Sequence, residues 1–177
     1  MNDLLGSTLL DAARSRFQEY KTMGERALAQ CPDDAINRIL APGSNSIAVI
    51  VHHVGGNLRS RWTDFLTADG EKPDRNRDAE FDEVNVSRET LMQWWEDGWS
   101  ACLGTLAALT PDDMSKTITI RGQPLSVVDA MYRSLAHTSY HVGQIVLLVK
   151  IFVGDDWKTL SIPRGGSDAY TKQLNQK

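Results

Sequence analysis

Cysteine is scarce in this sequence. Only two are present among the 177 residues, Cys31 and Cys102. They lie far apart and form no C-x-x-C pair, which excludes a disulfide framework and a zinc site built from thiolates. We therefore expect the protein to occupy a reducing compartment, with a cytoplasmic localisation.

Excess positive charge and long apolar runs are also lacking. The net charge is −4 and the isoelectric point is about 5.5, whereas a nucleic-acid surface needs a basic face. The longest apolar run, residues 145–153, is interrupted by Lys150 and falls short of the roughly 18 residues that cross a membrane. The first residues lack the basic and apolar regions of a signal peptide. These absences predict that neither a nucleic acid nor a membrane is a partner.

The common catalytic motifs are missing as well. The sequence contains no H-E-x-x-H, no G-x-S-x-G, no phosphate-binding P-loop and no dinucleotide-binding glycine motif. The first of these absences excludes a zincin. Any active site must therefore come from another grouping of polar side chains.

The sequence is instead rich in helical periodicity. Apolar residues recur at three- and four-residue steps in four segments, which we expect to be helices. The expected helices span residues 3–30, 47–67, 88–109 and 126–152. With 177 residues and 41% hydrophobic content, we expect a single all-α domain over residues 1–177. Its bundle core covers residues 3–153, and a tail covers residues 154–177.

Two connections between these helices are unusual. Residues 67–86 form a long, charged crossover between the second and third helices, and we considered it either a lid over a pocket or a solvated linker. Its composition favours the solvated linker. Residues 117–123 alternate and then turn at Gly122, which predicts a short two-stranded excursion before the fourth helix.

Several residues inside the helices do not fit a simple amphipathic pattern. Gly55 and Gly56 in mid-helix indicate the close approach of a neighbour or room for a ligand. Trp94 and Trp95 lie at helical spacing and are more typical of core packing than of a ligand box. Arg16 lies within an apolar stripe, which we attribute to a buried stem with its head at the surface, or alternatively to a pocket.

All four histidines fall into two clusters. His137 and His141 are four residues apart on one predicted helix, so their Cβ atoms lie about 5–6 Å apart on the same face. The residues in line with them are small or apolar, so this pair faces inward. His52 and His53 flank the apolar stripe of the second helix on opposite sides. Arg59 lies on the same side of the helix as His52, which favours His53 as the inward partner. His52 remains an alternative.

Buried imidazoles need partners, and three of them can share a metal ion. Neutral imidazole suits Zn, Ni, Fe or Cu. Three protein ligands plus water form the open arrangement of catalytic sites, in which a metal lowers the pKa of bound water or of a thiol. The histidine pattern therefore predicts a divalent transition metal, either in an open catalytic site or as a structural ion.

Three stretches of the sequence resemble the DinB/YfiT-like metalloenzymes. They are the helix-two pattern at residues 46–54, the turn at residues 118–122, and Leu135-Ala136-His137-Thr138-Ser139-Tyr140-His141-Val142-Gly143-Gln144-Ile145. The resemblance covers residues 5–155. The tail at residues 157–165 resembles that of one bacterial subgroup without an assigned function.

This resemblance implies a four-helix bundle with a long crossover between helices two and three. It implies that His53, His137 and His141 are the metal ligands, with Zn or Ni preferred and Fe or Cu as alternatives. It also implies a homodimer and a small-molecule substrate. Some relatives are transferases that use low-molecular-weight thiols.

Two functions of different kinds follow. The first is a metal-dependent enzyme, a thiol S-transferase or a hydrolase, in which the metal activates a nucleophile against a small molecule. No catalytic residue is assigned, but Asn57, Arg59, Arg16 and Tyr140 are candidates for orienting the substrate. The second is a non-catalytic, stress-related binding protein with a structural metal.

Overall fold

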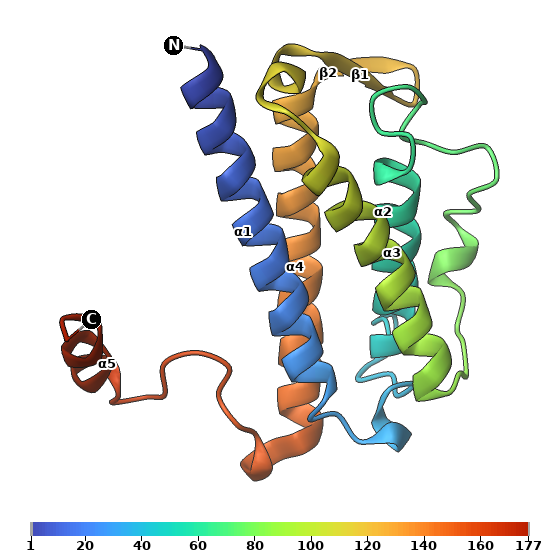
Figure 1. Cartoon of the computed structure of the whole chain (residues 1–177). Coiled ribbons are helices and arrows are strands. Elements are labelled where there is room, and N and C mark those ends of the chain that lie inside the picture. Colours follow the sequence, from blue (N-terminus) through green and yellow to red (C-terminus); the bar gives the residue numbers. More distant parts are fainter. Residues whose placement is uncertain (1, 177) are drawn as a thin grey trace.

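Four long helices pack side by side in the computed structural model, which describes residues 2–176 (Figure 1). They are α1 (Asn2–Leu28), α2 (Ile47–Trp62), α3 (Arg88–Ala108) and α4 (Val127–Val153). Short 3-10 helices occur at η1 (Asp33–Ala35), η2 (Ala79–Phe81), η3 (Pro111–Ser115) and η4 (Gly154–Asp156). The all-α bundle predicted from the periodicity is confirmed.

Serine side chains begin three of these helices. Ser46, Ser87 and Ser126 each accept a hydrogen bond from the backbone N–H three residues ahead, which satisfies one of the free donors of α2, α3 and α4. The second helix ends at Trp62, five residues earlier than predicted. The reason is local, because Asp64 adopts a positive φ of 48° that a continuing helix does not allow.

A two-stranded hairpin caps one end of the bundle, as the alternating pattern predicted. Strand β1 (Thr117–Ile120) pairs antiparallel with β2 (Gln123–Ser126), and the turn between them has positive φ at Arg121 and Gly122. Asp69 of the crossover accepts hydrogen bonds from both of these turn N–H groups, at 2.8 and 2.7 Å. The crossover is thereby fixed to the hairpin.

Aromatic side chains fill the centre of the bundle. Trp62, Trp95, Trp99 and Phe17 are all fully buried, and Phe17 packs edge-on against Trp62 at 5.3 Å between ring centroids. Trp95 therefore has the predicted core position. Trp94 is only partly buried and stacks instead on His52, at 4.2 Å.

Close packing of α2 against α3 depends on glycine. A Cβ atom on Gly98 of α3 would lie 2.7 Å from the Gly55 Cα, and one on Gly55 would lie 2.3 Å from the Trp94 carbonyl oxygen. The two helix backbones therefore touch at this point, as the mid-helix glycines predicted. Gly56 instead leaves space for the side chain of Glu80.

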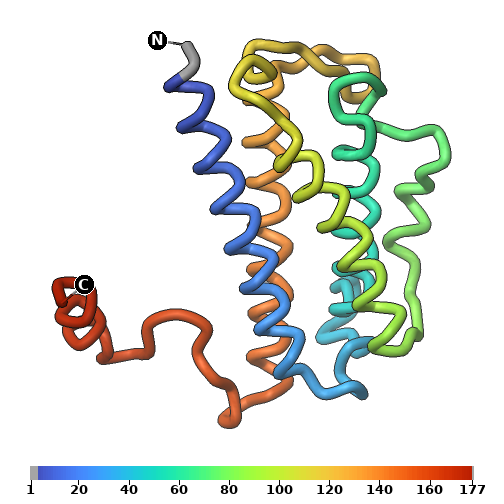
Figure 2. The backbone as a smooth tube through the Cα atoms, in the orientation of Figure 1, coloured from blue at the N-terminus to red at the C-terminus, as the bar shows by residue number. Residues whose placement is uncertain are grey.

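The C-terminal tail leaves the bundle after α4. Trp157 and Leu160 pack against the core, as predicted, and the short helix α5 (Ser167–Leu174) lies out to one side of the bundle (Figure 2). Within residues 2–176, no helix combines the length and apolar character that crossing a membrane requires.

Candidate metal centre

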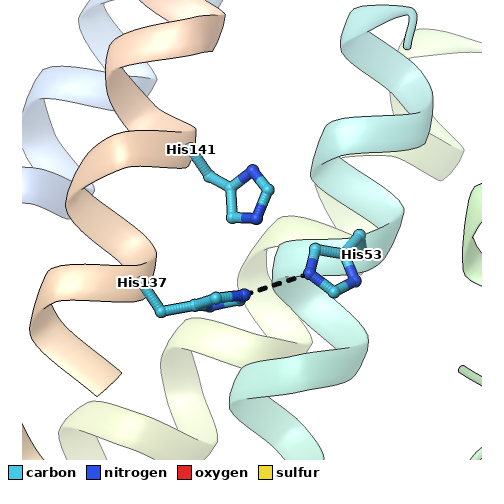
Figure 3. A group of neighbouring side chains, drawn as sticks. All are labelled: His53, His137 and His141. Atoms are coloured by element: carbon cyan, nitrogen blue, oxygen red, sulfur yellow. Dashed lines mark hydrogen bonds between the residues drawn. The ribbon is translucent and has the colours of Figure 1, made fainter. Parts of the chain in front are cut away.

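Three histidines from two helices meet inside the bundle. His53 comes from α2, and His137 and His141 come from successive turns of α4, with their rings directed toward one another (Figure 3). One ring nitrogen from each lies within 4.8 Å of the others, and the group is suited to hold a metal ion. His53 and His141 are buried, with only 2% and 5% of their surface exposed.

Hydrogen bonds fix which nitrogen faces this centre in two of the three rings. His53 Nδ1 lies 2.9 Å from Glu80 Oε2, and His141 Nδ1 lies 2.8 Å from Gln144 Oε1. Because both partners are acceptors, each Nδ1 carries the proton and each Nε2 keeps its lone pair. A carboxylate or amide behind the imidazole is the usual second partner of a metal-bound histidine.

The Nε2 atoms themselves are short of protein partners. His53 Nε2 and His137 Nε2 lie 3.2 Å apart, while His141 Nε2 is buried with no hydrogen-bond partner among the described residues. A buried acceptor without a partner is costly. A cation shared by the three Nε2 atoms removes that cost, so these residues fit a transition metal that prefers imidazole.

Glu80 is held rigidly behind His53. Arg75 donates to both of its carboxylate oxygens at 2.7 Å, and the two side chains are only 4% and 6% exposed. A Cβ atom on Gly56 would lie 2.3 Å from Glu80 Oε1, so glycine at this position leaves room for the carboxylate. Both Arg75 and Glu80 belong to the crossover. The favoured interpretation of that segment as a solvated linker is therefore wrong for these residues, because they pair with each other and with His53 in the interior.

The same environment sets the charges of the site. Burial, together with the neighbouring histidines and arginines, lowers the pKa of His137 to about 3. Burial also lowers the pKa of His141 to about 4, although its bond to Gln144 opposes the shift. For Glu80, burial by itself raises the pKa, but the hydrogen bonds from Arg75 and His53 outweigh it and lower the value. At neutral pH these two imidazoles are uncharged and Glu80 is ionised, which is the state that metal binding needs.

A cavity of about 370 Å³ opens beside the histidines. The three histidines lie on its wall together with Asn57 and Tyr140, two of the side chains predicted to orient a substrate. Its other walls include arginines and the apolar side chains Trp62, Phe65, Phe81 and Ile120. A volume of this size accommodates a small molecule.

Three other residues singled out in the sequence lie elsewhere. His52 stacks on Trp94 of α3 and faces a separate cavity, which Arg59 also lines. Burial lowers the pKa of His52. Arg16 is an exposed residue of α1 whose head group pairs with Glu19, so the predicted surface position of the head group is confirmed, while the side chain as a whole is exposed.

Sequence reasoning missed the residues behind the histidines. Gln144 had a local signal, since it lies three residues after His141 on the same helix face. Glu80 and Arg75 had none, because they lie in an irregular segment and reach His53 only through the tertiary fold.

Fold and site together define an all-α bundle with a buried three-histidine group beside a cavity. Residues 5–166 match the family described as "Protein of unknown function (DUF1572)", so the chain belongs to that family. No curated protein matches the sequence.

Solved structures with a similar fold are known, and one of them comes from Enterococcus faecalis. It is described as "Crystal structure of the conserved protein of locus from Enterococcus faecalis", and the similarity has a TM-score of 0.53. It covers 86% of this chain and 97% of that chain at 18% sequence identity. At this identity the similarity supports the fold alone.

Proposed function

We propose that this protein is a metal-dependent enzyme of the DinB/YfiT-like type, acting on a small molecule. The observation that carries the proposal is the convergence of three imidazoles at the wall of a cavity, with Glu80 and Gln144 fixing two of the tautomers. His53, His137 and His141 are the proposed ligands, for Zn or Ni in preference to Fe or Cu. A metal in such a site supplies Lewis-acid activation of water or of a thiol at neutral pH.

The chain's own residues have complementary tasks in this proposal. Glu80 orients His53 and offsets the positive charge of the centre, and Gln144 orients His141. The apolar side chains of the cavity wall offer a contact surface to the nonpolar part of a substrate. Low-molecular-weight-thiol transfer is the reaction that we favour, and hydrolysis is the alternative.

The competing proposal is a structural metal in a non-catalytic binding protein. A structural site is normally closed by a fourth protein ligand. Among residues 2–176, the group that can share one ion contains three side chains, and it borders the cavity. This arrangement favours the open, catalytic site.

Metal removal separates the two proposals. Untagged protein is treated with a chelator, and its helicity and its ability to consume a thiol in the presence of an electrophile are measured before and after metal is restored. We expect the bundle to stay folded, because its aromatic core is independent of the metal, while thiol consumption is lost and then recovered. Unfolding on metal removal would establish a structural metal. Thiol consumption that is indifferent to the metal would refute the enzyme proposal.

Homodimerisation is a further proposal inherited from the resemblance. It is supported by an apolar surface on α4, whose large side chains are exposed at Tyr132, Tyr140, Leu147 and Ile151. These residues follow one another at helical spacing and so share a face of α4. A second copy of the chain is the proposed partner for this face.

A further inference from the structure

The cavity beside the histidines has a strongly positive lining. Four arginines contribute to its wall, Arg61, Arg77, Arg121 and Arg133, whereas no aspartate or glutamate does so among the described residues. Two carboxylates lie next to these arginines. Glu71 pairs with both Arg61 and Arg121, at 2.8 and 3.0 Å, and Asp69 accepts from the Arg121 backbone N–H at 2.8 Å. These two negative charges do not balance the four guanidinium groups.

The other two arginines are freer still. Arg133 is exposed and makes no hydrogen bond or ion pair within residues 2–176. Arg77 pairs with Asp78 at 3.7 Å, where the carboxylate is 98% exposed, and its guanidinium lies over the Phe81 ring, 5.1 Å from the centroid. A surface pair of this kind contributes little. Both guanidinium groups therefore have donors available to a ligand.

Uncharged donors in the same cavity also lack partners. Asn57 is only 9% exposed, lines the cavity, and makes no hydrogen bond within the described part of the chain. Ser134 accepts a hydrogen bond from Trp62 Nε1 at 3.0 Å, so its own hydroxyl proton remains available. Both side chains are therefore free to donate to a ligand in the cavity.

Two of these arginines, Arg133 and Arg61, lie on the hairpin side of the histidines. Helices α2 and α4 are antiparallel, so steps forward from His53 and backward from His137 both lead toward the β1–β2 hairpin (Figure 1). Arg133 precedes His137 by one helical turn, or about 6 Å of rise, and Arg61 follows His53 by about 12 Å. The arginine end of the cavity is therefore one to two helical turns from the three histidines.

From this arrangement we infer that the substrate is an elongated small molecule with an anionic group, a carboxylate or a phosphate, at one end. Arg133, one helical turn from His137 toward the hairpin, and Arg77 of the crossover bind the anion. Asn57, also one turn from its histidine, donates a hydrogen bond at the same height as Arg133. The opposite end of the molecule lies at the histidines. Placing the reacting end there rests on the proposed metal-dependent function, whereas the anion site stands on the arginines alone. Guanidinium groups suit this task because they donate two parallel hydrogen bonds to either anion.

The test measures binding, which does not require turnover. The probes are 4-phenylbutanoate and its neutral amide, 4-phenylbutanamide, titrated by calorimetry into the protein as purified and after chelator treatment. We expect the carboxylate to bind about tenfold more tightly than the amide in both preparations, since its hydrogen bonds to guanidinium groups are charge-assisted. Phenyl phosphate then shows which of the two anions the cavity prefers.

Variants assign this preference to the arginines. The double variant Arg77→Gln/Arg133→Gln should reduce the preference to less than about threefold, while Arg133→Lys should retain part of it. Arg16→Gln on α1 is the matched control, because Arg16 is exposed and lies outside this cavity. Circular dichroism melting checks that each variant is folded, which we expect because both substituted arginines are exposed.

Two results would overturn the inference. One is equal affinity for the carboxylate and the amide, or a preference that survives in the double variant. The other is a preference that disappears on chelator treatment, since a metal and not the arginines would then bind the anion. The metal-dependent function can fail without the anion site failing. In that case the purified protein contains no transition metal but still binds the carboxylate more tightly than the amide.

Discussion

Replacing Glu80 by glutamine tests whether the residue behind His53 prepares the metal centre. The carboxylate accepts from His53 Nδ1 at 2.9 Å and from Arg75 at 2.7 Å on each oxygen. An amide retains the volume but loses the charge, and one of its two ends is a donor. Loss of such a partner typically lowers metal affinity about 10- to 100-fold. We expect the Zn²⁺ affinity of Glu80→Gln to fall within that range.

The same substitution also affects stability. It leaves the buried guanidinium of Arg75 with a single carboxylate, Glu71, at 3.5 Å. Breaking a buried pair costs about 3–5 kcal/mol, and the remaining contact places the expected loss near the lower end. Urea unfolding of metal-free protein measures this loss separately from metal affinity, which is measured by competition with a chromophoric chelator.

Two further variants make this experiment decisive. Glu83→Gln is the matched control, because Glu83 is an exposed residue of the same crossover. Gly56→Ala keeps the charge of Glu80 but displaces its carboxylate, since the new Cβ would lie 2.3 Å from Oε1. We expect Gly56→Ala to weaken metal binding as well. If Glu80→Gln binds Zn²⁺ as tightly as Glu83→Gln does, Glu80 has no role in the centre.

Three other predictions concern stability and assembly. The pKa values of His137 and His141 are lowered from 6.5 to about 3 and about 4. Below pH 6.5 the unfolded chain therefore binds more protons than the folded one, so metal-free protein should lose stability as the pH falls from about 6.5 toward 4. Urea titrations measure this loss, and a stability that does not change with pH would contradict these shifts. Gly98→Ala should lower the free energy of unfolding by about 1–3 kcal/mol through overpacking. Gly104 lies on the same helix with open space around it, so Gly104→Ala should be neutral or stabilise the protein by up to about 1 kcal/mol. Leu147→Glu should convert the proposed dimer into a monomer in light scattering, and an unchanged mass would remove α4 from the interface.

The helices were predictable because their signal is local. Apolar residues at three- and four-residue steps and a serine before each of the last three helices are visible in the sequence alone. The proximity of His137 and His141 follows from the same periodicity. The end of α2 was missed because it depends on the backbone conformation of Asp64, which no apolar pattern records.

The remainder of the site depends on tertiary contacts. His52 and His53 flank the apolar stripe of α2 almost symmetrically, and the distinction between them comes from their neighbours, Trp94 of α3 for one and His137 of α4 for the other. Glu80 and Arg75 were assigned to a solvated linker because their segment is charged and irregular. Only the folding of that segment over Gly56 brings the carboxylate to His53.

The most direct test of the central claim is the metal content of the protein. Untagged wild type, a His52→Ala variant and a His53→Ala/His137→Ala/His141→Ala variant are purified identically and analysed by inductively coupled plasma mass spectrometry. We predict about one transition metal per chain in the first two and none in the triple variant, because three imidazoles share a single ion. Equal metal content in the wild type and the triple variant would contradict the assignment of these histidines as ligands.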